Sequence, residues 1–177
     1  MNFNPVIWPH AALSSALVIA IQLTAYTLGV DAMVSPWNSL ALALTFPLGM
    51  SLALVALRRE EDHVLSFRRG FFHAWAVAAA MQTAQTAFQL LLYHVLAPDL
   101  VAAVVEATLD SMDERLGAFA EANPDSAEFR SELKAALLEG LSVQGLLVSA
   151  LWGTLFAAAG AAVVALVFRR RPPSQFD

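Results

Sequence analysis

Four long tracts without a charged side chain dominate this sequence: residues 5–30, 32–57, 70–98 and 140–168. A helix needs about 20 apolar residues to cross the hydrocarbon core of a bilayer, and each tract is longer than that. Because lipid offers no partner to an unpaired backbone group, such tracts form helices and not loops or open strands. The sequence therefore predicts an all-α integral membrane four-helix bundle, with spans at about 8–30, 37–57, 70–97 and 142–168.

The composition fits a chain embedded in a membrane. Hydrophobic residues make up 58% of the 177 residues and charged residues 14%, whereas a soluble domain carries about 25% charged residues. The absence of cysteine excludes disulfides, thiolate metal sites and cysteine nucleophiles. The first tract lacks the basic start and the cleavage site of a secretory signal, so we expect a retained span. A single membrane domain then occupies residues 1–177.

Seven of the nine arginines lie in two regions at the predicted membrane boundaries: Arg58, Arg59, Arg68 and Arg69 around the second loop, and Arg169, Arg170 and Arg171 after the fourth tract. Positive residues favour the cytoplasmic side, so we expect both boundaries and both termini in the cytoplasm. The segment 98–141 then lies outside, and its acidic side chains account for the net charge of −5. No basic face for nucleic acid is present.

The segment 98–141 has helical periodicity. Its apolar side chains recur every three or four residues: Val101, Val105, Leu109, Met112, Leu116 and Phe119. This spacing predicts an amphipathic helix over about 99–122. Asn123 and Pro124 break it, Asp125 and Glu128 have the spacing of a capping box, and a second apolar stripe from Phe129 is expected to continue into the fourth span. We expect an extracytoplasmic helical hairpin that packs over the bundle, with a docking face for another protein as the alternative.

Small residues recur at every fourth position of the fourth tract: Gly145, Ser149, Gly153, Ala157 and Ala161. One stripe of that helix thus has almost no side-chain bulk, so another helix can approach it closely. Packing within the chain is the favoured interpretation, and homodimerisation is the alternative. In the second tract, Pro47 and Gly49 are expected to bend the helix or loosen its hydrogen-bond ladder.

The third tract is the polar one. Gln82, Gln85 and Gln89 lie three and four residues apart and share one helical face, with Thr86 beside them. An amide that faces lipid is costly. Hydrogen bonds to other tracts would fix the register of the helices and contribute about 0.6 to 2 kcal/mol each; the candidate partners are Gln22, Thr24, Ser149 and Thr154. The alternative is a polar lining for a substrate or water path, but no charged residue accompanies it.

No residue pattern indicates catalysis or a bound metal. The sequence has no nucleophile elbow, no His-Glu-x-x-His pair and no phosphate-binding glycine loop, so we expect neither an enzyme nor a cofactor. His73 and His94 lie near opposite ends of the third tract, separated by about 30 Å at the helical rise per residue. They cannot share one metal ion.

Two short motifs flank the third tract: Ser-Phe-Arg-Arg-Gly-Phe-Phe at 66–72 and Ala-Pro-Asp-Leu at 97–100. With the charged amphipathic segment and the final span that ends in a basic cluster, they resemble a family of small bacterial membrane proteins, domain of unknown function 4199. The resemblance covers essentially the whole chain, although the family pattern has Asn where Ala97 stands. It implies four spans in a bacterial inner membrane and assigns no activity or catalytic residue.

These features favour an accessory or scaffolding protein of the inner membrane, whose helices mediate packing or contact with a partner. The expected partners are membrane lipid and either another membrane protein or a second copy of the chain. A small transporter or channel component, with a path lined by the glutamines, is the alternative. Buried hydrogen-bond partners for the amides would favour the scaffold, and a continuous wet cavity would favour transport.

Overall fold

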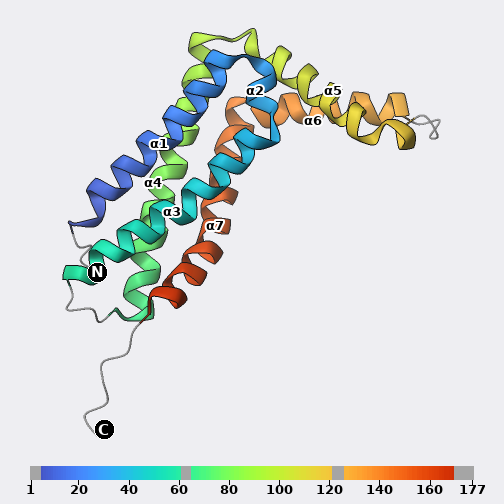
Figure 1. The fold of residues 1–177 in the computed structure, drawn as a ribbon. Helices are drawn as coiled ribbons and strands as arrows, with labels where there is room; N and C mark the ends of the chain where they lie inside the picture. Colours follow the sequence, from blue (N-terminus) through green and yellow to red (C-terminus); the bar gives the residue numbers. More distant parts are fainter. Residues whose placement is uncertain (1–4, 61–64, 121–125, 170–177) are drawn as a thin grey trace, which may run out of the picture.

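The computed structural model describes residues 5–60, 65–120 and 126–169, without the side chains of 115–120, 126 and 127. In these ranges every regular element is a helix (Figure 1). Four long helices form a bundle: α1 (Ile7–Leu28), α3 (Pro36–Glu60), α4 (Phe67–Leu91) and α7 (Val143–Phe168). The short α2 (Val30–Val34) joins α1 to α3, and the π-helical turn η1 (Leu92–Leu96) extends α4. Helices α5 (Leu100–Ala120) and α6 (Ser126–Leu141) lie between η1 and α7 in the chain.

Three helices, α1, α3 and α7, are long and apolar enough to cross a membrane. A fourth candidate span consists of two parts: α4 with η1 is the first part, and α5 is the second. The chain bends by 113° between these two parts, so they count as a span only if the bent pair is treated as one. The glutamines of α4 lower its hydropathy, which explains why α4 differs from the other long helices. Three to four apolar helices of this length indicate a membrane protein.

Helix α4 occupies the centre of the bundle and packs against α1, α3 and α7. The chain alternates in direction, so that α3 ends and α4 begins at the same end of the bundle (Figure 1). Arg58 and Arg59 lie in the last turn of α3, and Arg68 and Arg69 in the first turn of α4. We call this the basic end, and the opposite end, where α2 and η1 lie, the α2 end.

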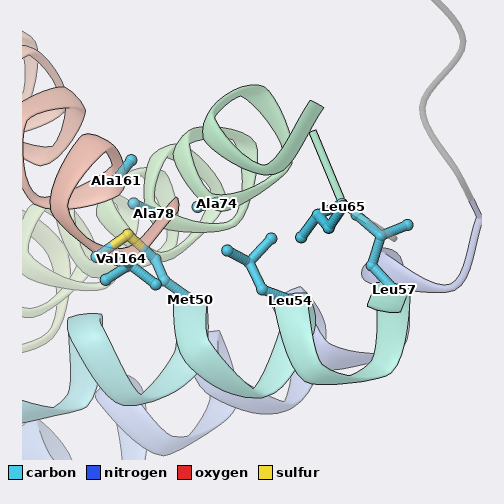
Figure 2. Packing of buried hydrophobic residues seen from close by; sticks show 8 residues of the cluster. All are labelled: Met50, Leu54, Leu57, Leu65, Ala74, Ala78, Ala161 and Val164. Carbon is cyan, nitrogen blue, oxygen red and sulfur yellow. The ribbon is translucent and has the colours of Figure 1, made fainter. Parts of the chain in front are cut away.

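The core of the basic end combines large side chains from α3 with small ones from its neighbours. Its buried members are Met50, Leu54, Leu57, Leu65, Ala74, Ala78, Ala161 and Val164. In Figure 2, Leu54, Leu57 and Leu65 approach one another near the end of α3, and Met50 points toward Val164. Burial of an apolar side chain from lipid gives no transfer energy, so close packing must hold these helices together. The alanines of α4 and α7 permit that packing.

Serine and glycine set the ends of the long helices. Ser66 Oγ accepts a hydrogen bond from the Arg69 amide at 3.4 Å and caps α4. Ser142 Oγ accepts one from the Gly145 amide at 3.0 Å and caps α7. Gly29, with φ of 106°, ends α1 in a conformation that other residues rarely adopt.

The junction of α6 and α7 differs from the sequence prediction. Ser142 is extended, with ψ of 162°, so α6 ends there and a separate helix begins. The prediction that the apolar stripe of 129–141 continues into the fourth span was therefore wrong. A Cβ at Gly145 would overlap the carbonyl oxygen of Glu139, so this sharp corner requires glycine. The signal was present in the Ser-x-x-Gly spacing, which apolar periodicity alone does not weigh.

Other expectations correspond to observed elements. Helix α5 lies within two residues of the predicted 99–122. Helix α3 is one continuous helix with Pro47 inside it, and the bend expected at Pro47 and Gly49 stays a prediction. The break at Asn123 and Pro124 and the cap at Asp125 fall outside the described residues. The same holds for Arg170, Arg171 and the side chains of Leu116 and Phe119.

Candidate functional site

The glutamines of α4 lie in different surroundings, although they share one helical face. Gln82 covers Gly153 of α7, where an added Cβ would be 2.8 Å from the Gln82 Oε1 atom. Gln89, seven residues further along, lines a cavity together with Gln22 of α1. Gln85 lies between them, half-buried, and lines neither of the two cavities that contain its neighbours. The three glutamines of the predicted polar stripe therefore do not line one common cavity.

None of these three amides makes a hydrogen bond within the part of the chain that the structure describes. The nearby hydroxyls bond to their own helices: Thr24 to the carbonyl of Ala20, Thr86 to that of Gln82, and Thr154 to that of Ala150. Ser149 is exposed on α7. A direct link between α4 and α7 comes instead from Trp75, whose Nε1 donates to the carbonyl oxygen of Thr154 at 3.0 Å.

A polar cavity lies at the α2 end, between α1, the start of α3 and the end of α4. We call it the amide cavity; it has a volume of about 180 Å³, and its polar lining residues are Gln22, Asn38, Ser39, Gln89 and Tyr93. Its apolar lining comes from Ala25, Met33, Leu42 and Leu92. Only Ser39 among the lining residues is exposed, so the cavity reaches the surface there.

Several polar side chains of the amide cavity have no hydrogen bond to the described residues, and one of their atoms is fully buried. Gln22 and Tyr93 are each 7% exposed, and the described residues offer no hydrogen bond to either side chain. Asn38 Nδ2 donates to the carbonyl oxygen of Met33 at 2.9 Å, which leaves Asn38 Oδ1 buried without a partner. A buried polar group without a hydrogen bond costs about 1–3 kcal/mol. A molecule in the cavity that donates a hydrogen bond to Asn38 Oδ1 would remove this cost.

A second, wider cavity opens between α3 and α7. This lateral groove has a volume of about 490 Å³ and is apolar except for Gln82. Gly153 and Gly160 of α7 face Phe46 and Met50 of α3 across it. The lateral groove and the amide cavity share no lining residue.

The small-residue stripe of α7 serves two purposes. Gly153 accommodates Gln82, Ala157 packs against the core of the basic end, and Ala161 is fully buried in that core. Gly145 instead forms the corner with α6. Away from this stripe, α7 presents exposed large apolar side chains, which include Leu147, Leu151 and Leu155.

Helices α1 and α3 approach each other closely at Gly49. An added Cβ would lie 2.6 Å from Ser14 Oγ and 2.9 Å from Met81 Sδ. Sequence reasoning treated Gly49 only as a flexible position beside Pro47. A lone glycine in a membrane helix also indicates close packing, and that signal pointed to this contact.

Charged side chains join α5 to α6. Arg130 of α6 forms ion pairs with Asp110, at 3.1 Å, and with Asp113, and Lys134 pairs with Glu106. Helix α5 buries its apolar face, since Val105 and Leu109 are at most 2% exposed. Helix α6 has no buried side chain between Glu128 and Leu141. The two helices run side by side away from the bundle (Figure 1).

Two of the three histidines within the described ranges contact backbone carbonyls. His73 Nδ1 lies 2.7 Å from the carbonyl oxygen of Arg69, and His94 Nε2 lies 3.2 Å from that of Leu141. The second contact joins η1 to the end of α6. No group of three His, Asp or Glu side chains suited to a metal ion occurs among the residues that the structure describes.

Comparison with known proteins identifies a family. The family model described as "Protein of unknown function (DUF4199)" matches residues 10–170. This match confirms the resemblance carried by the motifs at 66–72 and 97–100. No curated protein and no solved structure matches the chain. Since the family model covers nearly the whole sequence, the chain belongs to the DUF4199 family.

Proposed function

We propose that this protein is an accessory or scaffolding protein of a bacterial inner membrane, and that α6 is its contact surface for a membrane-protein partner. In this proposal four spans cross the bilayer, the basic end faces the cytoplasm and the α5–α6 pair lies outside, since arginines favour the cytoplasmic side. The observation that carries it is the apolar side of α6 that begins at Phe129, which is 57% exposed. Leu133 and Leu137, one and two turns further along the same side, are half-buried.

The attachment of α6 supports this role. Helix α5 is fixed by its buried apolar face and by its contact with α2, and ion pairs from Arg130 and Lys134 then hold α6 beside it. Arg130 and Lys134 are thereby turned toward α5, and Phe129 stays exposed. A held amphipathic helix loses little conformational freedom when a partner covers it, which favours binding.

Site-specific photo-crosslinking tests the contact surface. A benzoylphenylalanine at position 129 is expected to capture a protein in native membranes, and the same group at position 131, on the opposite side of α6, is expected not to. Phe129→Glu should remove the captured protein from the purified sample without lowering the melting temperature, because Phe129 is exposed. Equal capture from both positions would contradict the proposal. Capture of lipid alone would assign α6 to the bilayer surface instead.

A small transporter or channel component is the second candidate, and the unpaired amides favour it. Gln82 lines the lateral groove and Gln89 lines the amide cavity, so a polar path would have to join them past Gln85. Gln85→Cys in this cysteine-free chain distinguishes the two candidates. A scaffold leaves this thiol inert to small hydrophilic reagents, like control thiols at Leu90 and Leu91. Labelling at Gln85 as fast as at Gln89 would make transport the better proposal.

A further inference from the structure

We propose that the amide cavity binds a small uncharged molecule that carries both hydrogen-bond donors and acceptors, such as a primary amide or a polyol. This inference is independent of the partner surface on α6. It rests on three properties of the cavity: its unsatisfied polar groups, the absence of charge in its wall, and its volume.

The polar side chains without hydrogen bonds favour a ligand that carries both hydrogen-bond donors and hydrogen-bond acceptors. Gln22 and Tyr93 are each 7% exposed, line the cavity and have no side-chain hydrogen bond within the described residues, and Asn38 Oδ1 is fully buried without a partner. The Asn38 amide cannot rotate to help them without losing its bond to the Met33 carbonyl, which fixes Nδ2 on that side. Each amide offers one acceptor oxygen and two donor protons. A ligand with the same pair of functions can satisfy both Gln22 and Gln89.

The wall of the cavity selects against charge. Its lining residues are amides, hydroxyls and apolar side chains, and none carries a formal charge. A charged ligand would leave its hydration shell without gaining an ion pair, and the result is a weaker affinity by a large factor. An uncharged molecule loses much less on entry, so charge is the property that distinguishes ligands from non-ligands here.

The volume limits the size of the occupant. A cavity of about 150 Å³ holds one benzene molecule, and the amide cavity has about 180 Å³. A molecule of similar bulk therefore fills it, and lipid or peptide is too large to be enclosed. Isobutyramide matches this size and has one amide group; isobutyrate has nearly the same shape and carries a negative charge. The two compounds form a matched pair of probes.

Protection of a thiol at the mouth of the cavity tests the proposal. Ser39→Cys provides a single thiol at the exposed edge, and its reaction with N-ethylmaleimide is followed in the purified full-length protein. At about twice its Kd, isobutyramide is expected to slow the reaction about threefold, because occupied sites do not react. Isobutyrate at the same concentration is expected to leave the rate unchanged. Ser131→Cys, on the exposed α6, is the control for effects of the additives on the reagent.

A second variant keeps the test decisive. Tyr93→Phe removes the hydroxyl and keeps the buried ring, so the fold is retained and the protection by isobutyramide should weaken. Equal slowing of the Ser39→Cys and Ser131→Cys proteins would overturn the proposal, and so would equal protection by the amide and the acid. If neither compound protects the thiol at position 39, water alone occupies the cavity, and the proposal fails. Unchanged protection after Tyr93→Phe is added would place the ligand elsewhere and overturn the proposal as well.

Discussion

Replacement of Gly49 by alanine probes a close contact between the helices α1 and α3. The new Cβ would lie 2.6 Å from Ser14 Oγ and 2.9 Å from both Ser14 Cβ and Met81 Sδ. Ser14 and Met81 are themselves buried, at 6% and 0% exposure. Because Ser14 Cβ is fixed to the backbone of α1, the strain can be relieved only if α1 and α3 move apart.

Two other glycines provide matched controls for the same substitution. At Gly160 the nearest atom would be Met50 Cε at 3.6 Å, which is an ordinary contact. At Gly153 the nearest atoms belong to the flexible end of Gln82, which can move into the lateral groove. All three glycines lie inside long helices, so the gain in helix propensity, about 1 kcal/mol, is the same and cancels in the comparison.

The expected magnitudes follow from these geometries. Overpacking a tight site costs about 1–3 kcal/mol, so Gly49→Ala should be less stable than Gly160→Ala by about that amount. Gly160→Ala should equal or exceed the stability of the unaltered protein by up to about 1 kcal/mol. Gly153→Ala should lie between them. The added Ser14→Gly should restore part of the stability of the Gly49→Ala protein, since it removes two of the three close atoms.

Reversible unfolding in mixed micelles, followed by tryptophan fluorescence, measures these differences. The order of stability, and not any single value, is the result that matters. If Gly49→Ala and Gly160→Ala unfold at the same denaturant concentration, α1 and α3 are not in close contact at Ser14. The packing argument for these helices would then be refuted.

Three further outcomes are expected. Trp75→Phe should lower the free energy of unfolding by about 1 kcal/mol, because its bond to the Thr154 carbonyl is lost; unaltered unfolding would show that this bond adds nothing. Arg130→Ala should speed amide hydrogen exchange in α6, and high salt should do the same to the unaltered protein, because its ion pairs are exposed. Slow exchange in both cases would show that other contacts hold α6. In spheroplasts, an impermeant thiol reagent should label Ser131→Cys and miss Ser174→Cys; the reverse pattern would invert the proposed orientation.

The helices could be predicted from the sequence because their cause is local. Absence of charge over more than 20 residues requires a helix in lipid, and arginines mark where such a helix ends. The observed α1, α3 and α7 begin and end within about three residues of the predicted spans. Gly29 and Ser66 provided further local signals for a helix end and a helix start.

The site could be predicted only in part because its cause is not local. The spacing of the glutamines places them on one face of α4, but the positions of α1, α3 and α7 decide what that face meets. Gln82 contacts Gly153 of α7, and Gln89 lines the amide cavity, whose wall includes Met33 of α2. No periodic signal indicated Tyr93 and Asn38, which come from two different helices and meet in the amide cavity.

The amide cavity and the α5–α6 pair share an apolar cluster at the α2 end. Leu92 and Tyr93 of the cavity wall belong to the same buried cluster as Val104 of α5 and Leu146 of α7. Met33, another wall residue, packs against this cluster from α2. A bound molecule that restrains the side chains of the cavity wall therefore also restrains the apolar cluster against which α5 packs.

Hydrogen exchange in the presence of isobutyramide tests this coupling. A ligand that binds the closed conformation of the cavity wall better than a locally open one shifts the protein toward the closed conformation. Because the wall and α5 belong to one apolar cluster, α5 should then open less often as well. We expect slower exchange in η1 and α5, and no change at the basic end, where the core cluster is separate. Slower exchange confined to the lining residues would show that ligand and partner surface act independently. Since Tyr93→Phe keeps the ring in the cluster and removes only the hydroxyl, it should abolish the effect of the ligand and leave the exchange of the unliganded protein as it was.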